Sequence, residues 1–304
     1  MSREILIAAV QMPNFRSGET NAEKREANFR LAEEWLDQAG QHKADIACLG
    51  ECFNVNGLEL TSANLVSELE GATEAVVERL GEVARRHQMV VIAPVYCLLV
   101  GIPRNAALVL NQTGELVGNY CKVHPTRGEM EVGIVAGDSW PVFELDFGTV
   151  GVQICHDNSF IESARCLALN GAEIIFTPHV MSGWGDELMS ILLRSPAIYN
   201  GIHHVPVCYG LEPERAWRPG MMLGRSSVIG PDGVVIADAG RYPGVAYAAV
   251  DLDRPRIAHD FTHAGDHPWR AEMLADRRPD IYSPITRPQA ETSAPAYPAQ
   301  LEKA

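Results

Sequence analysis

A cysteine stands directly after an apolar run, where an α/β protein can use it as a nucleophile. The run extends over Thr149–Ile154, and Cys155 follows it, with His156 and Asp157 next. Strand ends that lie next to helix starts open into the crevices where α/β proteins keep their reactive groups. We therefore expect Cys155 to attack an electrophilic carbon, provided that other residues supply a base and a partner for the developing charge.

Two further polar residues follow predicted strands and can supply these functions. Glu51 comes after the short apolar segment Asp45–Leu49, and Lys122 comes after the segment Glu115–Tyr120. A free thiol has a pKa of about 8.5 and needs a base at neutral pH, and Glu51 can accept its proton. The Lys122 ammonium and the backbone N–H of His156 can then hold the negative charge that develops on the substrate oxygen.

The obvious alternative base is the imidazole of His156, the neighbour of Cys155. Adjacent residues at the end of a strand point to opposite faces of the sheet, so their side chains are poorly placed to share a proton. The spacing therefore disfavours a Cys155–His156 dyad and favours a base from another strand.

The elements that must position these residues alternate between strands and helices. A capping-box pattern at Thr20 and Glu23 begins a helix that ends at Gly40, and 73–88 repeats the apolar period of a helix. The other predicted helices are 160–170 and 186–200, and the predicted strands are 5–10, 45–49, 89–96, 105–110, 115–120, 143–145, 149–154, 173–177, 205–209, 224–229, 234–238 and 245–252. This alternation indicates packed α/β layers in one large unit.

Composition excludes several classes of partner. The chain has 304 residues, 46% of them hydrophobic, and a formal net charge of −14, which leaves no surplus of Lys and Arg for nucleic acid. The seven cysteines are odd in number and form no C-x-x-C pair, which predicts reduced thiols in the cytoplasm. No segment approaches membrane-spanning length, so we expect a small-molecule substrate and no membrane or nucleic-acid partner.

One segment near the C-terminus resembles a metal site at first. His259, His263 and His267 occur at four-residue spacing together with Asp260 and Asp266. A glycine and a proline within the segment interrupt any helix that would align these side chains, so we interpret it as a polar loop and predict no metal site.

The three candidate residues and their surroundings together resemble the nitrilase superfamily of carbon–nitrogen hydrolases, with its Glu-Lys-Cys triad. The order and spacing of the matching pieces are intact over roughly residues 4 to 282, which makes the resemblance more specific than any single motif. The pieces are Gly50–Phe53, Tyr120–His124, Val150–Asp157, Arg194 with Ala197 and Asn200, Gly224–Ile229, Pro231–Gly233 and Arg277–Tyr282.

The resemblance implies a four-layer α-β-β-α sandwich that pairs with a second subunit through its helices. It places the hydrolase domain at residues 1–282, followed by a tail at 283–304 that is rich in Pro and Ala. It also implies a second catalytic glutamate between the lysine and the nucleophile. Glu129 and Glu131 both qualify, and Glu129 is preferred for its Gly-Glu-Met setting.

The activity implied by the resemblance is cofactor-free hydrolysis of a small-molecule amide or N-carbamoyl group through a cysteine acyl-enzyme. The sequence His156–Ser159 lacks the paired arginines of the carbamoylases that act on N-carbamoyl-D-amino acids, and it also differs from the Cys-Trp-Glu of nitrilases proper. Amidase and carbamoylase branches therefore fit better than a nitrilase. Nitrile hydrolysis, acyl transfer and a non-catalytic scaffold remain as alternatives.

Two residues after the predicted strand 173–177 are candidates for substrate binding. His179 and Trp184 follow a strand that we expect to end at the same edge as Cys155. They can line the substrate pocket, although ordinary loop packing explains them equally well.

Overall fold

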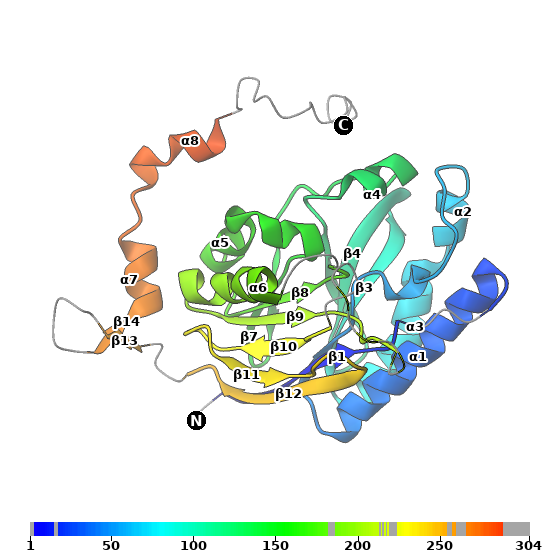
Figure 1. Ribbon diagram of the computed structural model, residues 1–304, viewed down its shortest axis with the longest axis horizontal. Coiled ribbons are helices and arrows are strands. Elements are labelled where there is room, and N and C mark those ends of the chain that lie inside the picture. Colours follow the sequence, from blue (N-terminus) through cyan, green and yellow to red (C-terminus); the bar gives the residue numbers. More distant parts are fainter. Residues whose placement is uncertain are drawn as a thin grey trace.

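The backbone forms two six-stranded sheets that lie face to face, with helices on both outer sides (Figure 1). The computed structural model describes residues 3–14, 18–181, 186–212, 214, 216, 218, 224–253, 257–259 and 266–287. The first sheet contains, in spatial order, β12 (Gly244–Asp251), β1 (Glu4–Gln11), β2 (Ile46–Cys48), β3 (Val90–Leu99), β4 (Ile102–Leu110) and β5 (Leu116–Cys121). The second contains β11 (Val235–Asp238), β10 (Ser227–Ile229), β9 (His203–Val207), β8 (Ile174–Pro178), β7 (Gly148–Val152) and β6 (Val142–Leu145).

Each sheet has a parallel centre and antiparallel edges. Strands β1, β2 and β3 pair in parallel in one sheet, and β7, β8 and β9 do so in the other. The hairpins β4–β5 and β6–β7 are antiparallel and are built from strands that the sequence predicted. Buried parallel strands read as near-continuous apolar runs because both of their faces are covered.

Helices α1 (Asn21–Gln41) and α3 (Ala72–His87) cover the first sheet, and α5 (Ile161–Leu169) and α6 (Asp186–Asn200) cover the second (Figure 1). The predicted four-layer α-β-β-α sandwich is thereby confirmed. The remaining elements are α2 (Leu65–Leu69), α4 (Arg127–Val132), α7 (Trp269–Ala275), α8 (Ser283–Thr286), β13 (Ile257–His259), β14 (Asp266–Pro268) and the single 3-10 turns η1 (Phe53–Val55), η2 (Cys155–Ser159) and η3 (Pro279–Ile281).

Alternation along the strands creates two cores. In β1, the side chains of Ile5, Ile7 and Ala9 enter the core between the sheets, whereas Ala8 and Val10 face the helices α1 and α3. Successive side chains of a strand point to opposite faces, so one apolar strand can serve both cores. The core between the sheets therefore leaves polar groups a place only near the strand ends.

The predicted start of α1 is confirmed by its cap. Thr20 Oγ1 accepts a hydrogen bond from the Glu23 backbone N–H at 3.2 Å, and the Glu23 carboxylate accepts one from the Thr20 N–H at 3.1 Å. This reciprocal capping box satisfies two donors that a helix start otherwise leaves without partners.

The C-terminal segment leaves the sandwich and arches past α5 through α7 to α8 (Figure 1). Of the predicted tail, which begins at Ser283, the structure describes α8 and Arg287. The predicted polar loop is strand at both of its ends: His259 ends β13, and Asp266 and His267 lie in β14, which pairs antiparallel with β13, whereas 260–265 lie outside the described residues. In the described part of the chain, no three His, Cys, Asp or Glu side chains are grouped so that they could hold a metal ion. No helix in that part is both long and apolar enough to cross a membrane.

Candidate active site

The side chains of Glu51, Lys122 and Cys155 line one cavity of about 460 Å³ between the two sheets. Glu51 follows β2 and Lys122 follows β5, both in the first sheet, whereas Cys155 follows β7 in the second. The three residues thus come from two facing sheets, and the site lies where these sheets open. The rest of the wall is Cys52, Val55, Asn56, Gly57, Leu60, Tyr96, Thr126, Gly128, Glu129, Val132, Val180 and Tyr209.

The Lys122 ammonium lies between two carboxylates. Its Nζ donates to Glu51 Oε1 and to Glu129 Oε2, each at 2.8 Å, and the lysine side chain is only 1% exposed. Burial by itself lowers the pKa of Lys122, but the negative charges of Glu51 and Glu129, and that of Cys155 when it is a thiolate, outweigh burial and raise the pKa well above its ordinary value. The lysine is therefore a fixed cation in the cavity wall.

Glu129 is the second glutamate that contacts the lysine. Its Oε2 also accepts the Thr126 backbone N–H at 2.7 Å, because Thr126 and Glu129 form the capping box of α4. Burial raises the pKa of Glu129, but the charge and hydrogen bond of Lys122 overcome this and lower the pKa below its ordinary value. Glu131 instead pairs with Arg127 at 2.8 Å, and both side chains are exposed.

Asn105 joins the two carboxylates, and the sequence analysis did not identify it. Its Nδ2 donates to Glu51 Oε1 at 2.8 Å and to Glu129 Oε1 at 2.6 Å, and the residue is 1% exposed on β4. Tyr96 Oη adds a hydrogen bond to Glu129 Oε1 at 3.1 Å. The sequence feature that could have identified Asn105 is a polar amide at the start of an otherwise apolar predicted strand, because a buried polar group needs hydrogen-bonding partners.

Glu51 is held in place from the second sheet as well. The Val180 N–H, just after β8, donates to Glu51 Oε2 at 3.1 Å, and Tyr209 Oη donates to the Glu51 carbonyl at 2.8 Å. A Cβ at Gly50 would lie 2.9 Å from the Tyr209 ring, so the glycine allows this tyrosine to approach the backbone.

Cys155 opens a turn and does not directly end a strand. The predicted strand 149–154 is shorter in the structure: β7 stops at Val152, and Cys155 starts η2 with a φ of 48°. A left-handed residue other than glycine costs of the order of 1–3 kcal/mol and is typical of active sites, where the surrounding contacts hold it. The sharp turn directs the thiol into the cavity.

The Cys155 thiol and the Glu51 carboxylate line the same cavity. Burial raises the pKa of Cys155 well above its ordinary value, and the Glu51 charge adds to the increase while Lys122 opposes it. In the resting site the cysteine is consequently a neutral thiol that faces a carboxylate and an ammonium. A proton can pass directly from Sγ to Glu51 when the thiol attacks.

The His156 ring is turned away from this proton path. Its Nδ1 lies 3.2 Å from the His124 carbonyl oxygen, and its ring packs edge-on against Phe160. The prediction that His156 does not pair with the thiol agrees with this geometry, although the cause is the turn at Cys155 and not the alternation of a strand.

The side chain of His179 is enclosed in the protein, and the described wall of the cavity does not include it. Its Nδ1 accepts the Met181 N–H at 3.3 Å, and burial, with a smaller effect of His204, lowers its pKa to about 3. Its neighbour Val180 lines the cavity instead, because the chain turns after β8. Trp184 lies outside the described residues.

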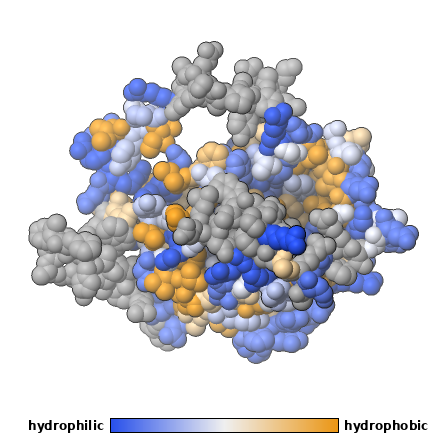
Figure 2. All heavy atoms as spheres, viewed as in Figure 1, coloured by the Kyte–Doolittle hydropathy of each residue, from blue (hydrophilic) through white to orange (hydrophobic). Residues whose placement is uncertain are grey.

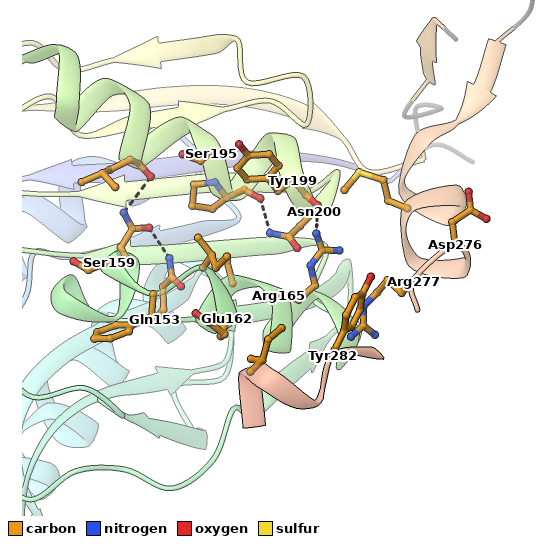
Figure 3. Close-up of a pocket in the computed structure, with 18 residues that line it drawn as sticks. Gln153, Ser159, Glu162, Arg165, Ser195, Tyr199, Asn200, Asp276, Arg277 and Tyr282 are labelled. Atoms are coloured by element: carbon orange, nitrogen blue, oxygen red, sulfur yellow. Dashed lines mark hydrogen bonds between the residues drawn. The ribbon is translucent and has the colours of Figure 1, made fainter. Parts of the chain in front are cut away.

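A second cavity, of about 480 Å³, lies between α5, α6 and the C-terminal segment (Figure 3). Arg165 and Tyr199 stand on the helix side, and Arg277 and Tyr282 stand on the side of the C-terminal segment. It holds no pairing of thiol, carboxylate and ammonium, so the chemistry of the molecule centres on the cavity with Cys155.

A family model described as carbon-nitrogen hydrolase matches residues 6–258 of the chain. A deaminated glutathione amidase of Synechocystis is 29% identical over 267 residues, which cover 82% of this chain and 92% of that protein. An omega-amidase of Xenopus tropicalis is 25% identical over 272 residues, which cover 84% of this chain and 91% of the relative.

Solved structures of amidases share the fold. An amidase from Nesterenkonia sp. superimposes with a TM-score of 0.72 at 20% identity, covering 92% of this chain and 96% of that chain. A variant of this amidase in complex with butyramide gives a TM-score of 0.71 at 20% identity, with 92% and 96% covered. At this identity, the likeness concerns the fold.

Proposed function

The chain belongs to the carbon-nitrogen hydrolase family, and from that premise we propose that it hydrolyses the carboxamide of a small molecule through a covalent Cys155 acyl-enzyme. The observation that carries the proposal is one cavity lined by the buried Cys155 thiol, by Glu51 and by the Lys122 ammonium, which donates to Glu51 at 2.8 Å. A nucleophile, a base and a cation lie within direct reach of one another.

In the first half-reaction, Glu51 takes the thiol proton while Sγ forms a bond to the amide carbon. The carbonyl oxygen gains the negative charge and becomes an oxyanion. The intermediate collapses, the C–N bond breaks, and protonated Glu51 gives its proton to the leaving nitrogen, so that ammonia departs and a thioester remains. In the second half-reaction, Glu51 takes a proton from water, the hydroxyl adds to the thioester, and the thiolate leaves and recovers that proton.

Lys122 holds the oxyanion in this scheme. An ammonium has three N–H donors, and the two carboxylates take two of them, which leaves one for the substrate oxygen. The backbone N–H of His156, in the turn that Cys155 opens, is the proposed second donor. Glu129 keeps the lysine charged and oriented.

The described lining favours an uncharged acyl group. Lys122 is the only cation among the described residues of the wall, and its charge is already balanced by two carboxylates. The apolar side chains of Val55, Leu60 and Val132 offer contacts to a short aliphatic or amide-bearing chain. An N-carbamoyl amine presents the same planar NH2–C=O group and is the closest alternative substrate.

The test is release of ammonia from a panel of neutral aliphatic amides, omega-amides of dicarboxylic acids, N-carbamoyl amines and acids, and nitriles. We expect turnover of the neutral amides and loss of that turnover in C155A. Hydroxylamine added as an acyl acceptor separates transfer from hydrolysis by the hydroxamate it forms. Full activity of the C155A protein, or turnover of nitriles alone, contradicts the proposal. If no electrophile labels the Cys155 thiol of the native wild-type protein, the result supports the alternative of a non-catalytic scaffold protein.

We also propose that the protein is at least a homodimer, paired through the α5 and α6 face. Apolar side chains stand exposed there: Ile161 is 76% exposed, Ile191 is 65% exposed and Tyr199 is 57% exposed. The C-terminal segment arches beside this face and leaves an opening in the surface (Figure 2). Analytical ultracentrifugation of the wild type and of Ile191→Glu tests this: we expect a dimer that the charged side chain dissociates.

The proposed compartment is the cytoplasm, and the proposed domain limits are 1–282 for the hydrolase and 283–304 for the tail. The seven cysteines form no disulfide in the structure, which supports a reducing environment. Removal of residues 283–304 is expected to leave the arrangement of the active-site residues unchanged. The test is whether the shortened chain keeps its amidase activity.

A further inference from the structure

A buried carboxylate two residues after Cys155 connects the loops that carry the lysine and the nucleophile. Asp157 has no exposed surface. Its Oδ1 accepts the His124 backbone N–H at 2.9 Å and lies 2.9 Å from the His124 ring Nδ1. Its Oδ2 accepts the Tyr120 Oη–H at 2.6 Å and the Ile154 backbone N–H at 2.8 Å.

The partners of this carboxylate belong to different sheets. Tyr120 and His124 flank Lys122 at the end of β5 in the first sheet, whereas Ile154 precedes Cys155 after β7 in the second. Strands β5 and β7 share no ladder of hydrogen bonds, so the sheets alone do not fix the separation of ammonium and thiol. Asp157 spans the junction.

We propose that Asp157 is a positioning residue that sets the Cys155 thiol against the Lys122 ammonium by tying the two loops together. It does not touch the reacting atoms. This inference rests on the proposed function, because a fixed relation between thiol and ammonium matters only if both act on one carbonyl group.

Neighbouring aromatic contacts stiffen the same junction. The His124 ring stacks on the Phe160 ring with centroids 3.8 Å apart, and the Tyr120 ring stacks on Trp140 at 5.6 Å. Tyr120 Oη, which donates to the aspartate, also accepts the Val123 N–H at 3.2 Å. The left-handed backbone at Cys155 persists only where such contacts over-determine it.

An asparagine cannot replace the aspartate without loss. Each carboxylate oxygen faces one backbone N–H, that of His124 on one side and that of Ile154 on the other. Whichever way an amide is turned, its NH2 group meets one of these donors. Asp157→Asn therefore keeps the shape of the side chain but breaks one of the two ties.

The test compares Asp157→Asn with the wild type in kcat, KM and the rate at which iodoacetamide alkylates Cys155, followed by mass spectrometry of its peptide. We expect kcat to fall about 10²-fold with little change in KM, as for a small misplacement of reacting groups, and alkylation to slow as well. Leu36→Ala is the matched control, because Leu36 is a fully buried residue of α1 in the core between this helix and the first sheet. It should lower the thermal midpoint and leave kcat and alkylation unchanged.

A folded Asp157→Asn protein with kcat within threefold of the wild type and normal alkylation overturns the inference. If that variant does not fold, Tyr120→Phe replaces it, because this change removes one hydrogen bond of the Asp157 carboxylate. We expect kcat to be about tenfold lower. A wild-type kcat refutes the proposal that Asp157 holds the two loops together. Activity that survives in C155A refutes the proposed function itself, so the two failures are distinguishable.

Discussion

Replacement of Glu129 by glutamine tests whether the second glutamate acts through the charge of the lysine. The glutamine can keep its carbonyl oxygen toward Lys122 and Thr126 and turn its NH2 toward Tyr96 and Asn105. Asn105 Nδ2 also donates to Glu51, so the asparagine amide stays in place and the variant loses only the hydrogen bond between Asn105 and residue 129. The change therefore removes a charge while leaving most of the hydrogen bonds possible.

The expected effect is large because the pair is buried at 2.8 Å. With an effective dielectric constant of about 20, two unit charges at this distance attract by about 6 kcal/mol, and solvent and the remaining Glu51 reduce what is lost to about 2–4 kcal/mol. Glu129 helps to raise the pKa of Lys122, so its loss lowers that pKa. The ammonium is then lost at a lower pH than in the wild type.

The assay is the pH dependence of kcat for ammonia release, and Glu131→Gln is the matched control two residues away. We expect Glu129→Gln to shift the alkaline limb to lower pH and to reduce kcat at least tenfold at neutral pH. Glu131, which is exposed and paired with Arg127, should give a wild-type profile. Equal profiles for both variants would refute the reasoning.

Three further outcomes follow from the same contacts. Folded Glu129 has a pKa below its ordinary value of 4.5, so its charge stabilises the fold above pH 4.5, and this stabilisation is lost as the pH falls through the folded pKa. In denaturant unfolding below pH 4.5, Glu129→Gln should therefore lose less stability than the wild type. Asn105→Ala removes a hydrogen-bond donor from two buried carboxylates. We expect the unfolding free energy to fall by about 2–4 kcal/mol and kcat to fall as well. If both values are unchanged, Asn105 does not have the role described. Thr20→Ala removes the cap of α1 and should cost about 1 kcal/mol in urea unfolding while kcat stays unchanged, with Thr113→Ala in an exposed turn as the control.

Cys155, Glu51 and Lys122, the proposed nucleophile, base and cation, could be singled out in the sequence because each is a polar residue at the end of an apolar run. Such a pattern indicates a buried strand whose end opens into a crevice, and it can be recognised without knowing which other residues the polar side chain contacts. Helix α1 was likewise predictable, since its capping box and apolar period are local. The hairpins β4–β5 and β6–β7 follow from short turns between apolar runs.

The contacts of the site were not readable in the same way. Whether Glu129 or Glu131 meets Lys122 depends on which side of the short helix α4 faces the cavity. Asn105 is 54 residues from Glu51, to which it donates, and Asp157 is two residues from Cys155, which it is proposed to position. No repeating pattern in the sequence points to either relation. The enclosure of His179 results from the turn after β8, which no local pattern predicts.

The sequence by itself therefore indicated most of the elements and the three polar groups at strand ends, because propensity, capping and hydrophobic alternation act over a few residues, whereas the four layers followed from the family resemblance. Only the tertiary structure decided that Glu51 and Lys122 come from one sheet and Cys155 from the other, and that Asn105 and Asp157 hold them together. The physical reason is that a hydrogen bond between sheets depends on how two packed layers face each other, and that arrangement is a property of the whole core.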